Sequence, residues 1–197
     1  MKEASAKSIV IESPMSVDTM SLSSIGVYMM FRPVDEESAE HLCEFIIKSN
    51  FMLPHTQPLT IMINSPGGSV YDGFGIIDLM ECSRLKVHTV AVGAVASMGA
   101  VIFTAGSKGN RTMTKNSFIM THQFSSMMFG KYHELVATRE HEDILQDRMV
   151  EHFVRNSKMT EKQVRDVILG PSDKWITAAE ALKYGLCDRI QDPWVCK

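Results

Sequence analysis

A chain of 197 residues, 45% hydrophobic and 22% charged, has the composition of one globular domain that buries its own core. Its formal net charge of −3 gives no basic surface, so we expect no nucleic-acid partner. No stretch approaches the ~20 apolar residues of a membrane span, and the N-terminus lacks a signal peptide's apolar core. The four cysteines form no metal-binding spacing and fit free thiols in a reducing compartment. We expect a cytoplasmic protein without a metal or membrane partner; the compartment would be the host cytoplasm for a viral chain or the organelle matrix for an organellar one.

The first half of the chain alternates between predicted strands and helices. Residues 1–24 are rich in serine and are expected to form an N-terminal arm, followed by a single domain over 25–197. Strands are predicted at 25–31, 58–64 and 87–92, and helices at about 35–50, 70–82 and 98–105. This alternation is typical of a parallel sheet with crossover helices, so the fold class is α/β.

The second half contains shorter elements and one long helix. Strands are predicted at 110–114, 117–121 and 186–190, and helices at 160–168 and 178–183. Residues 175–177 lead into the second of these helices, which is short. Between the strand at 117–121 and the helix at 160–168, residues 131–156 form a long charged helix with apolar positions that include Leu135, Leu145, Met149 and Phe153.

Ser97 lies where a buried strand breaks into an apolar helix. The run at 87–92 leads into Gly93–Ala100, which reads G-A-V-A-S-M-G-A, and the helix ends near Gly106. A hydroxyl at this joint lies beside unpaired N–H groups that favour negative charge, which suits a nucleophile next to an oxyanion site. The alternative is an ordinary capping serine, and this stretch alone favours the cap.

The segment Asn64–Ser69, which reads N-S-P-G-G-S, follows a predicted strand. Open α/β sheets bind ligands at the carboxyl ends of their strands, and paired glycines let backbone amides turn toward a bound group. A phosphate loop is not predicted, because no Gly-Lys-Ser/Thr follows. The functional interpretation is an oxyanion hole made by the amides of Gly68 and Met98, and the alternative is a plain tight turn.

Among seven histidines, His122 is the preferred catalytic candidate. It ends the strand at 117–121, on the same predicted sheet edge as Gly68 and Ser97. His88 lies within a strand pattern and is expected to pack against its neighbours. The remaining five are expected to be solvated: His41, His55, His133, His141 and His152.

Asp173 comes late enough in the chain to return to the site. A triad needs an acid that fixes the histidine tautomer and stabilises the imidazolium. Asp173 could also be a turn or cap residue, and spacing alone does not select it over Asp166 or Asp188.

Four segments, in order, resemble the motifs of the proteolytic subunit of Clp protease. Ile63–Gly68 resembles that family's glycine segment, Ala96–Ala100 its nucleophile segment, and Ile119–Gln123 its histidine segment. Asp173–Ala181 resembles its acid segment, and the likeness runs from about residue 58 to 190. Four motifs in the same order argue against chance.

The resemblance implies a serine endopeptidase. By this likeness Ser97 attacks the peptide carbonyl, His122 acts as base and then acid, and Asp173 orients His122. The amides of Gly68 and Met98 would hold the oxyanion.

The resemblance also implies a fold and an assembly. The fold would be the spiral of repeated β-β-α units shared with crotonases, with residues 131–156 as a protruding handle helix. The family builds two stacked seven-membered rings that enclose the active sites, and an AAA+ unfoldase feeds them unfolded proteins or peptides. That unfoldase would use the ATP, and this chain would need no cofactor.

Three departures from the family pattern stand outside the triad. Met20–Pro33 replaces an arginine-bearing segment of the region that supplies axial loops and unfoldase-docking pockets. Phe124 stands where the family usually has proline. Pro171-Ser172 replaces a charged pair that links ring–ring contact to active-site alignment.

Other functions remain as alternatives. A crotonase-type acyl-CoA enzyme would use paired amides without a triad, and no acyl-CoA-binding surface is evident. A serine–lysine peptidase would usually carry a membrane segment. A non-catalytic structural ring subunit is the main rival, although such subunits typically lose a triad residue and this chain keeps all three.

Overall fold

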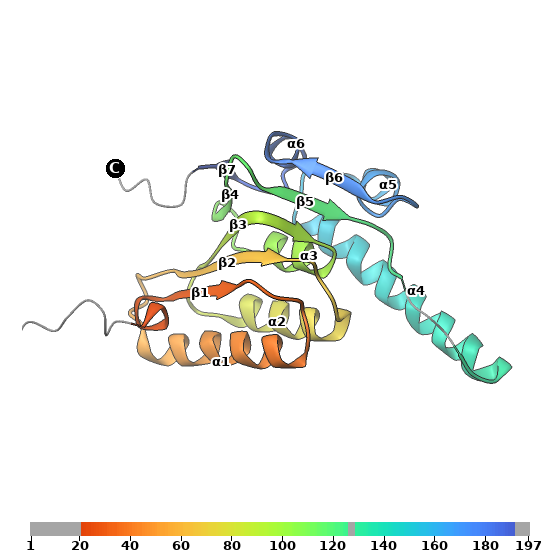
Figure 1. Ribbon diagram of the computed structural model, residues 1–197, viewed down its shortest axis with the longest axis horizontal. Helices are drawn as coiled ribbons and strands as arrows, with labels where there is room; N and C mark the ends of the chain where they lie inside the picture. Colours follow the sequence, from red (N-terminus) through yellow and green to blue (C-terminus); the bar gives the residue numbers. More distant parts are fainter. Residues whose placement is uncertain (1–20, 126–128, 192–197) are drawn as a thin grey trace, which may run out of the picture.

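The computed structural model describes residues 21–125 and 129–191 (Figure 1). Its strands are β1 (Val27–Met30), β2 (Leu59–Ser65), β3 (Val87–Ala96), β4 (Arg111–Met113), β5 (Phe118–Thr121), β6 (Lys174–Thr177) and β7 (Arg189–Ile190). Its helical elements are η2 (Leu22–Ile25), α1 (Glu36–Met52), α2 (Val70–Cys82), α3 (Met98–Thr104), α4 (Tyr132–Arg155), α5 (Glu161–Gln163), η3 (Val164–Ile168) and α6 (Ala178–Tyr184). The predicted α/β class is confirmed.

The strands form one mostly parallel sheet in the order β1-β2-β3-β4-β7, with β5 pairing β3 and β6. The long strand β3 pairs with β4 through Thr89–Ala91 and then with β5 through Ala94–Ala96. Gly93, at φ +73°, lies between these two registers. The second half of β3 therefore leads to Ser97 directly beside the strand that leads to His122.

Helices α1 and α2 pack together beneath β1 and β2 (Figure 1). Helix α1 begins at a capping box, in which the Asp35 carboxylate accepts from the Ser38 amide and the Ser38 hydroxyl accepts from the Asp35 amide. The apolar positions predicted to face inward are all buried, namely Ala39, Leu42, Phe45 and Ile46. Burial of this stripe fixes the helix on the sheet.

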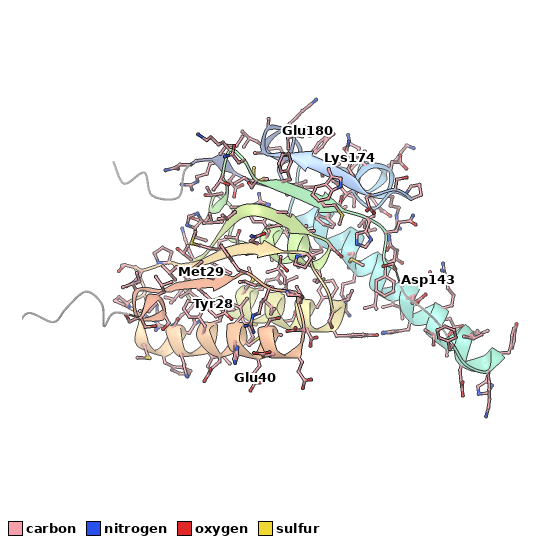
Figure 2. All side chains as sticks on the ribbon, in the orientation of Figure 1. Tyr28, Met29, Glu40, Asp143, Lys174 and Glu180 are labelled. Carbon is pink, nitrogen blue, oxygen red and sulfur yellow. The ribbon has the colours of Figure 1, made fainter. Side chains whose placement is uncertain are left out.

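Helix α4 has two unlike halves. Its C-terminal half contributes Leu145, Met149 and Phe153 to the buried core. Its N-terminal half extends away from the sheet (Figure 1), and Figure 2 shows Asp143 among the side chains that stand clear of it. This arrangement matches the handle predicted over 131–156.

His152 was expected to be solvated, and this prediction is wrong. Its side chain is only 3% exposed, and its Nε2 lies 3.0 Å from Thr104 Oγ1 of α3. Positions 145, 149 and 152 follow the i, i+4, i+7 spacing of one helix face, so His152 shares the core-facing side of α4. The charged neighbours in the sequence obscured this placement.

Two further segments differ from their predictions. The helix expected over 160–168 is α-helical only at Glu161–Gln163 and continues as a π-helical turn, closed by the Leu169 amide on the Val164 carbonyl. Most of the predicted N-terminal arm, residues 1–20, lies outside the described residues, and Leu22–Ile25 forms a 3-10 turn. Within the described ranges, no helix is both long and apolar enough to cross a bilayer.

Candidate active site

Ser97 occupies a strained turn between β3 and α3. Its φ of 51° makes it the one non-glycine residue with positive φ in the described part of the chain, a conformation that costs ~1–3 kcal/mol. The turn is held because the Ser97 amide donates to the Met120 carbonyl at 2.8 Å and the Ser97 carbonyl accepts from the Ala100 amide at 2.9 Å. The Ser97 hydroxyl makes no capping hydrogen bond to α3. The capping alternative is therefore wrong for this serine.

The Ser97 hydroxyl instead meets His122. Oγ of Ser97 and Nε2 of His122 are 2.9 Å apart. They lie close together because Ala96 of β3 pairs with Met120 of β5, and the residues that follow these two parallel strands lie at the same edge of the sheet. The other ring nitrogen, Nδ1, is hydrogen-bonded to the carbonyl of Gln123. A proton on Nδ1 satisfies that carbonyl and leaves Nε2 free to accept from the serine.

Asp173 is not joined to this pair. Strands β5 and β6 are antiparallel with Thr121 opposite Lys174, so His122 and Asp173 lie one step beyond the last paired position. The exposed Asp173 carboxylate makes no hydrogen bond or ion pair with any described residue. The structure thus brings Ser97 and His122 together and leaves the predicted acid apart.

The two other aspartates considered as acids have other partners. Asp188 forms a paired contact with Arg111, including a 2.7 Å ion pair, and also accepts from the Gly109 amide. Burial acts to raise the pKa of Asp188, but these hydrogen bonds outweigh it and hold the pKa below its ordinary value. Asp166 lies 3.2 Å from Lys162 on the surface. Neither carboxylate contacts His122.

Gly67 and Gly68 pack closely against their neighbours, and Gly67 packs against the turn that contains Ser97. A Cβ on Gly67 would lie 2.6 Å from Ser97 Cβ, and a Cβ on Gly68, at φ +150°, would lie 2.2 Å from the Val34 carbonyl oxygen. Only glycine fits either position. The turn is also fixed by the Val34 amide on the Gly67 carbonyl and the Ser69 amide on the Val34 carbonyl.

Two backbone amides near Ser97, one in the glycine turn and one at the start of α3, are free to bind a ligand. The Gly68 amide makes no hydrogen bond to a described residue, whereas its neighbours Gly67 and Ser69 donate to Ser65 Oγ and the Val34 carbonyl. Met98 is the first residue of α3, where an amide has no intrahelical acceptor. These are the amides expected from the sequence to form an oxyanion hole, and they flank Ser97.

A cavity of about 270 Å³ adjoins Ser97 and His122. Most of its lining is apolar and comes from α2, α3, α4 and the turn after η3, namely Val70, Met98, Val101, Met149, Phe153 and Leu169. Small-molecule sites usually span ~300–1,000 Å³, so this cavity suits part of a larger chain, such as one apolar side chain.

Sequence reasoning missed several lining residues. Thr121 precedes His122, and its buried hydroxyl has no partner among the described residues. Tyr71 follows the glycine turn and contacts His141 of α4, a histidine expected only to be solvated. Strand alternation could have placed Thr121 inward, whereas no sequence signal pairs residues 70 positions apart.

The described ranges hold no group of three or more His, Cys, Asp or Glu side chains that could bind a metal ion.

Comparison with known proteins shows the family to which the chain belongs. The family model described as Clp protease matches residues 15–193. The ATP-dependent Clp protease proteolytic subunit of Deinococcus radiodurans is 34% identical over 161 residues, covering 81% of this chain and 77% of that protein. The ATP-dependent Clp protease proteolytic subunit 2 of Nocardia farcinica is 34% identical over 158 residues, covering 80% of this chain and 76% of that protein.

A third relative shows a shorter match. Proteolytic subunit 1 of Prochlorococcus marinus subsp. pastoris is 37% identical over 134 residues, covering 66% of this chain and 65% of that protein. The chain thus spans just under two thirds of this relative's length. The family match itself begins at residue 15, well before the motifs evident from the sequence. The chain belongs to the Clp protease family, among its proteolytic subunits.

Proposed function

We propose that this protein is a serine endopeptidase in which Ser97 is the nucleophile and His122 the general base. The observation that carries the proposal is the 2.9 Å contact between Ser97 Oγ and His122 Nε2, made by a serine in a strained turn that does not cap its helix. A catalytic base must lie within hydrogen-bond reach of the proton it removes, and this geometry satisfies that requirement.

The chemistry follows from these positions. As Ser97 Oγ attacks the substrate carbonyl, its proton passes to His122 Nε2 and a C–O bond forms. The amides of Gly68 and Met98 stabilise the resulting oxyanion, each such donor lowering the barrier by ~2.7–4 kcal/mol. His122 then gives the proton to the leaving amine as the C–N bond breaks. In the second half of the reaction, His122 takes a proton from water as the water oxygen attacks the acyl carbon. It then gives that proton to Ser97 Oγ as the ester C–O bond breaks and the acid product leaves.

Asp173 is proposed to orient His122 in the active state. Extending the β5–β6 ladder by one residue pair would set Asp173 opposite His122. A carboxylate there would stabilise the imidazolium more strongly than the neutral carbonyl of Gln123 does.

The substrates proposed are unfolded proteins or peptides with an apolar side chain at the cleaved bond, because the cavity beside Ser97 is lined mainly by apolar groups. Membership of the Clp protease family supports assembly into rings, with stacked heptamers joined through α4. It also supports a separate ATP-using AAA+ unfoldase as partner, while this chain itself uses no cofactor.

A non-catalytic ring subunit is the second candidate function. The separation of Asp173 from His122 favours it, because a histidine without its carboxylate is a poorer base. The two functions differ in one measurable property, which is turnover by the assembled protein.

Hydrolysis of a fluorogenic peptide with leucine before the cleaved bond tests the proposal. Wild-type protein should turn over the peptide, and Ser97→Ala should abolish turnover with unchanged sedimentation. Ser125→Ala is the matched control, because Ser125 lines the same cavity and should be dispensable. Equal turnover by wild type and Ser97→Ala would refute the nucleophile, and a stacked assembly without turnover would favour the non-catalytic subunit.

A further inference from the structure

Tyr71 and His141 form a contact that the proposed reaction does not use. The Tyr71 hydroxyl lies 2.9 Å from His141 Nε2, and the two rings are nearly parallel, with an interplanar angle of 6°. Tyr71 belongs to the first turn of α2, three residues after Gly68, and His141 belongs to α4. The contact therefore connects α4, the handle helix, to α2, which follows the glycine turn in the cavity wall.

The exposed fractions of the lining residues show where Tyr71 lies in the cavity. Met98 and Phe153 are at most 2% exposed and form the floor, whereas Tyr71 is 64% exposed and lines the same cavity. Tyr71 thus stands at the mouth. An exposed tyrosine without a partner samples several rotamers, and the bond to His141 selects one of them.

Helix α4 also contacts a second residue of the cavity lining. The amide of Phe124 donates to Gln146 Oε1 at 3.4 Å, and Phe124 also lines the cavity. A proline at position 124 would have no N–H to donate. Helix α4 thus contacts both Tyr71 and Phe124, and its own Met149 and Phe153 line the same cavity.

We infer that the Tyr71–His141 pair is a specificity-determining latch that limits how long a side chain the cavity accepts. With its hydroxyl held by α4, the Tyr71 ring closes the outer end of the cavity. Medium-length apolar side chains then fit, and larger ones such as tryptophan are disfavoured. This inference rests on the proposed peptidase function, because it concerns the cavity beside Ser97.

The test compares kcat/KM for two fluorogenic peptides that differ only in having leucine or tryptophan before the cleaved bond. Wild type should prefer leucine. Tyr71→Phe and His141→Ala should each lower the leucine-to-tryptophan ratio about threefold to tenfold, the effect of one net hydrogen bond. The double variant should match either single variant, because both changes remove the same bond.

A control variant separates the latch from general effects on α4. His133→Ala changes the same residue type as His141→Ala at an exposed position of that helix and should leave the ratio unaltered. An unchanged ratio in Tyr71→Phe and His141→Ala, additive effects in the double variant, or an equal shift in the control would each overturn the latch.

Labelling by a fluorophosphonate distinguishes failure of the latch from failure of the proposed function. If wild type and both variants are labelled at Ser97 yet show the same ratio, the latch alone is refuted. If wild type neither hydrolyses a peptide nor is labelled, the peptidase proposal falls and the latch falls with it.

Discussion

At the scale of single residues, His122 is the point where structure and expected chemistry diverge. Its Nε2 faces Ser97, but its Nδ1 is bonded to the Gln123 carbonyl instead of Asp173. A neutral carbonyl fixes the tautomer that the reaction needs, yet it stabilises the charged imidazolium less than a carboxylate would. In the proposed mechanism this arrangement would allow proton transfer from Ser97 to His122, but it lacks the carboxylate that would stabilise the imidazolium.

Replacing Asp173 tests whether it joins the pair in the active protein. Asp173→Asn should lower kcat by about 10⁴-fold with little change in stability, as removal of a triad carboxylate does. Asp166→Asn changes an exposed carboxylate on a surface ion pair and should have little effect on peptide turnover. An Asp173→Asn protein with full activity would leave the Gln123 carbonyl as the sole partner of His122.

Thr121 holds a buried hydroxyl without a partner among the described residues, next to His122. An unpaired buried hydroxyl costs ~1–3 kcal/mol, so the nearly isosteric Thr121→Val should raise the free energy of unfolding by about 1 kcal/mol. Urea denaturation measures this. Thr112→Val is the matched control, because the equally buried Thr112 hydroxyl lies 2.8 Å from His88 Nε2 and its loss should destabilise the fold. A loss of stability in Thr121→Val would show that its hydroxyl is satisfied.

The sequence predicted Ser97, His122, Gly68 and Met98 at one sheet edge because each follows a strand of recognisable pattern. It could not predict that Ser97 leaves its helix uncapped, since both roles use the same residue at the same joint. Nor could it place the Asp173 side chain, because that depends on where the β5–β6 ladder stops.

At the scale of elements, the packing interface between α3 and α4, called the seam below, contains the buried histidine His152. Burial, followed by the charges of Arg155 and Arg111, lowers the pKa of His152 to about 4 from an ordinary 6.5. Neutral His152 lies against Thr104 in the same helix that begins beside Ser97. Protonation would put an unpaired charge into this seam, between the handle and the active-site helix.

His152 should make the fold sensitive to acid. Because the folded state binds this proton only below about pH 4 and the unfolded state below 6.5, stability is full above pH 6.5 and falls as pH drops toward 4. The total loss from this group is about 3 kcal/mol. Urea titrations of wild type and His152→Gln across pH 4–7 should show a steeper decline for wild type.

His133→Gln changes an exposed histidine of the same helix and should leave the wild-type profile intact. Parallel curves for wild type and His152→Gln would contradict the acid-sensitive seam.

Most elements were predictable because their apolar periodicity is local. The boundaries of α2 and the inward face of α1 follow directly from the sequence. The π-helical turn at Val164–Ile168 was not predictable, because its apolar pattern also suits an α-helix and the choice depends on tertiary contacts. The burial of His152 was missed for a similar reason, since its charged neighbours suggest a solvated face.

At the scale of the whole molecule, α4 presents exposed apolar side chains that the described chain does not cover. Tyr132 is 83% exposed, Val136 42% and Ile144 57%. Exposed apolar groups of this kind are typical of an interaction surface. They support the proposal that α4 joins two rings of the assembly.

A charge on this surface should separate the rings. Ile144→Glu would bury a carboxylate in the proposed ring contact, so sedimentation should shift from stacked to single rings. Thr138→Glu adds the same charge at an exposed position on another face of α4 and serves as the control. Unchanged sedimentation of Ile144→Glu would contradict a ring contact through this part of the handle.

The central claim is that Ser97 is a nucleophile activated by His122. Incubation of the purified protein with a fluorophosphonate probe, followed by peptide mapping, tests it most directly. We predict a single adduct on Ser97 that disappears in His122→Ala. Labelling of Ser97 that persists in His122→Ala, or an adduct on another serine, would contradict the account.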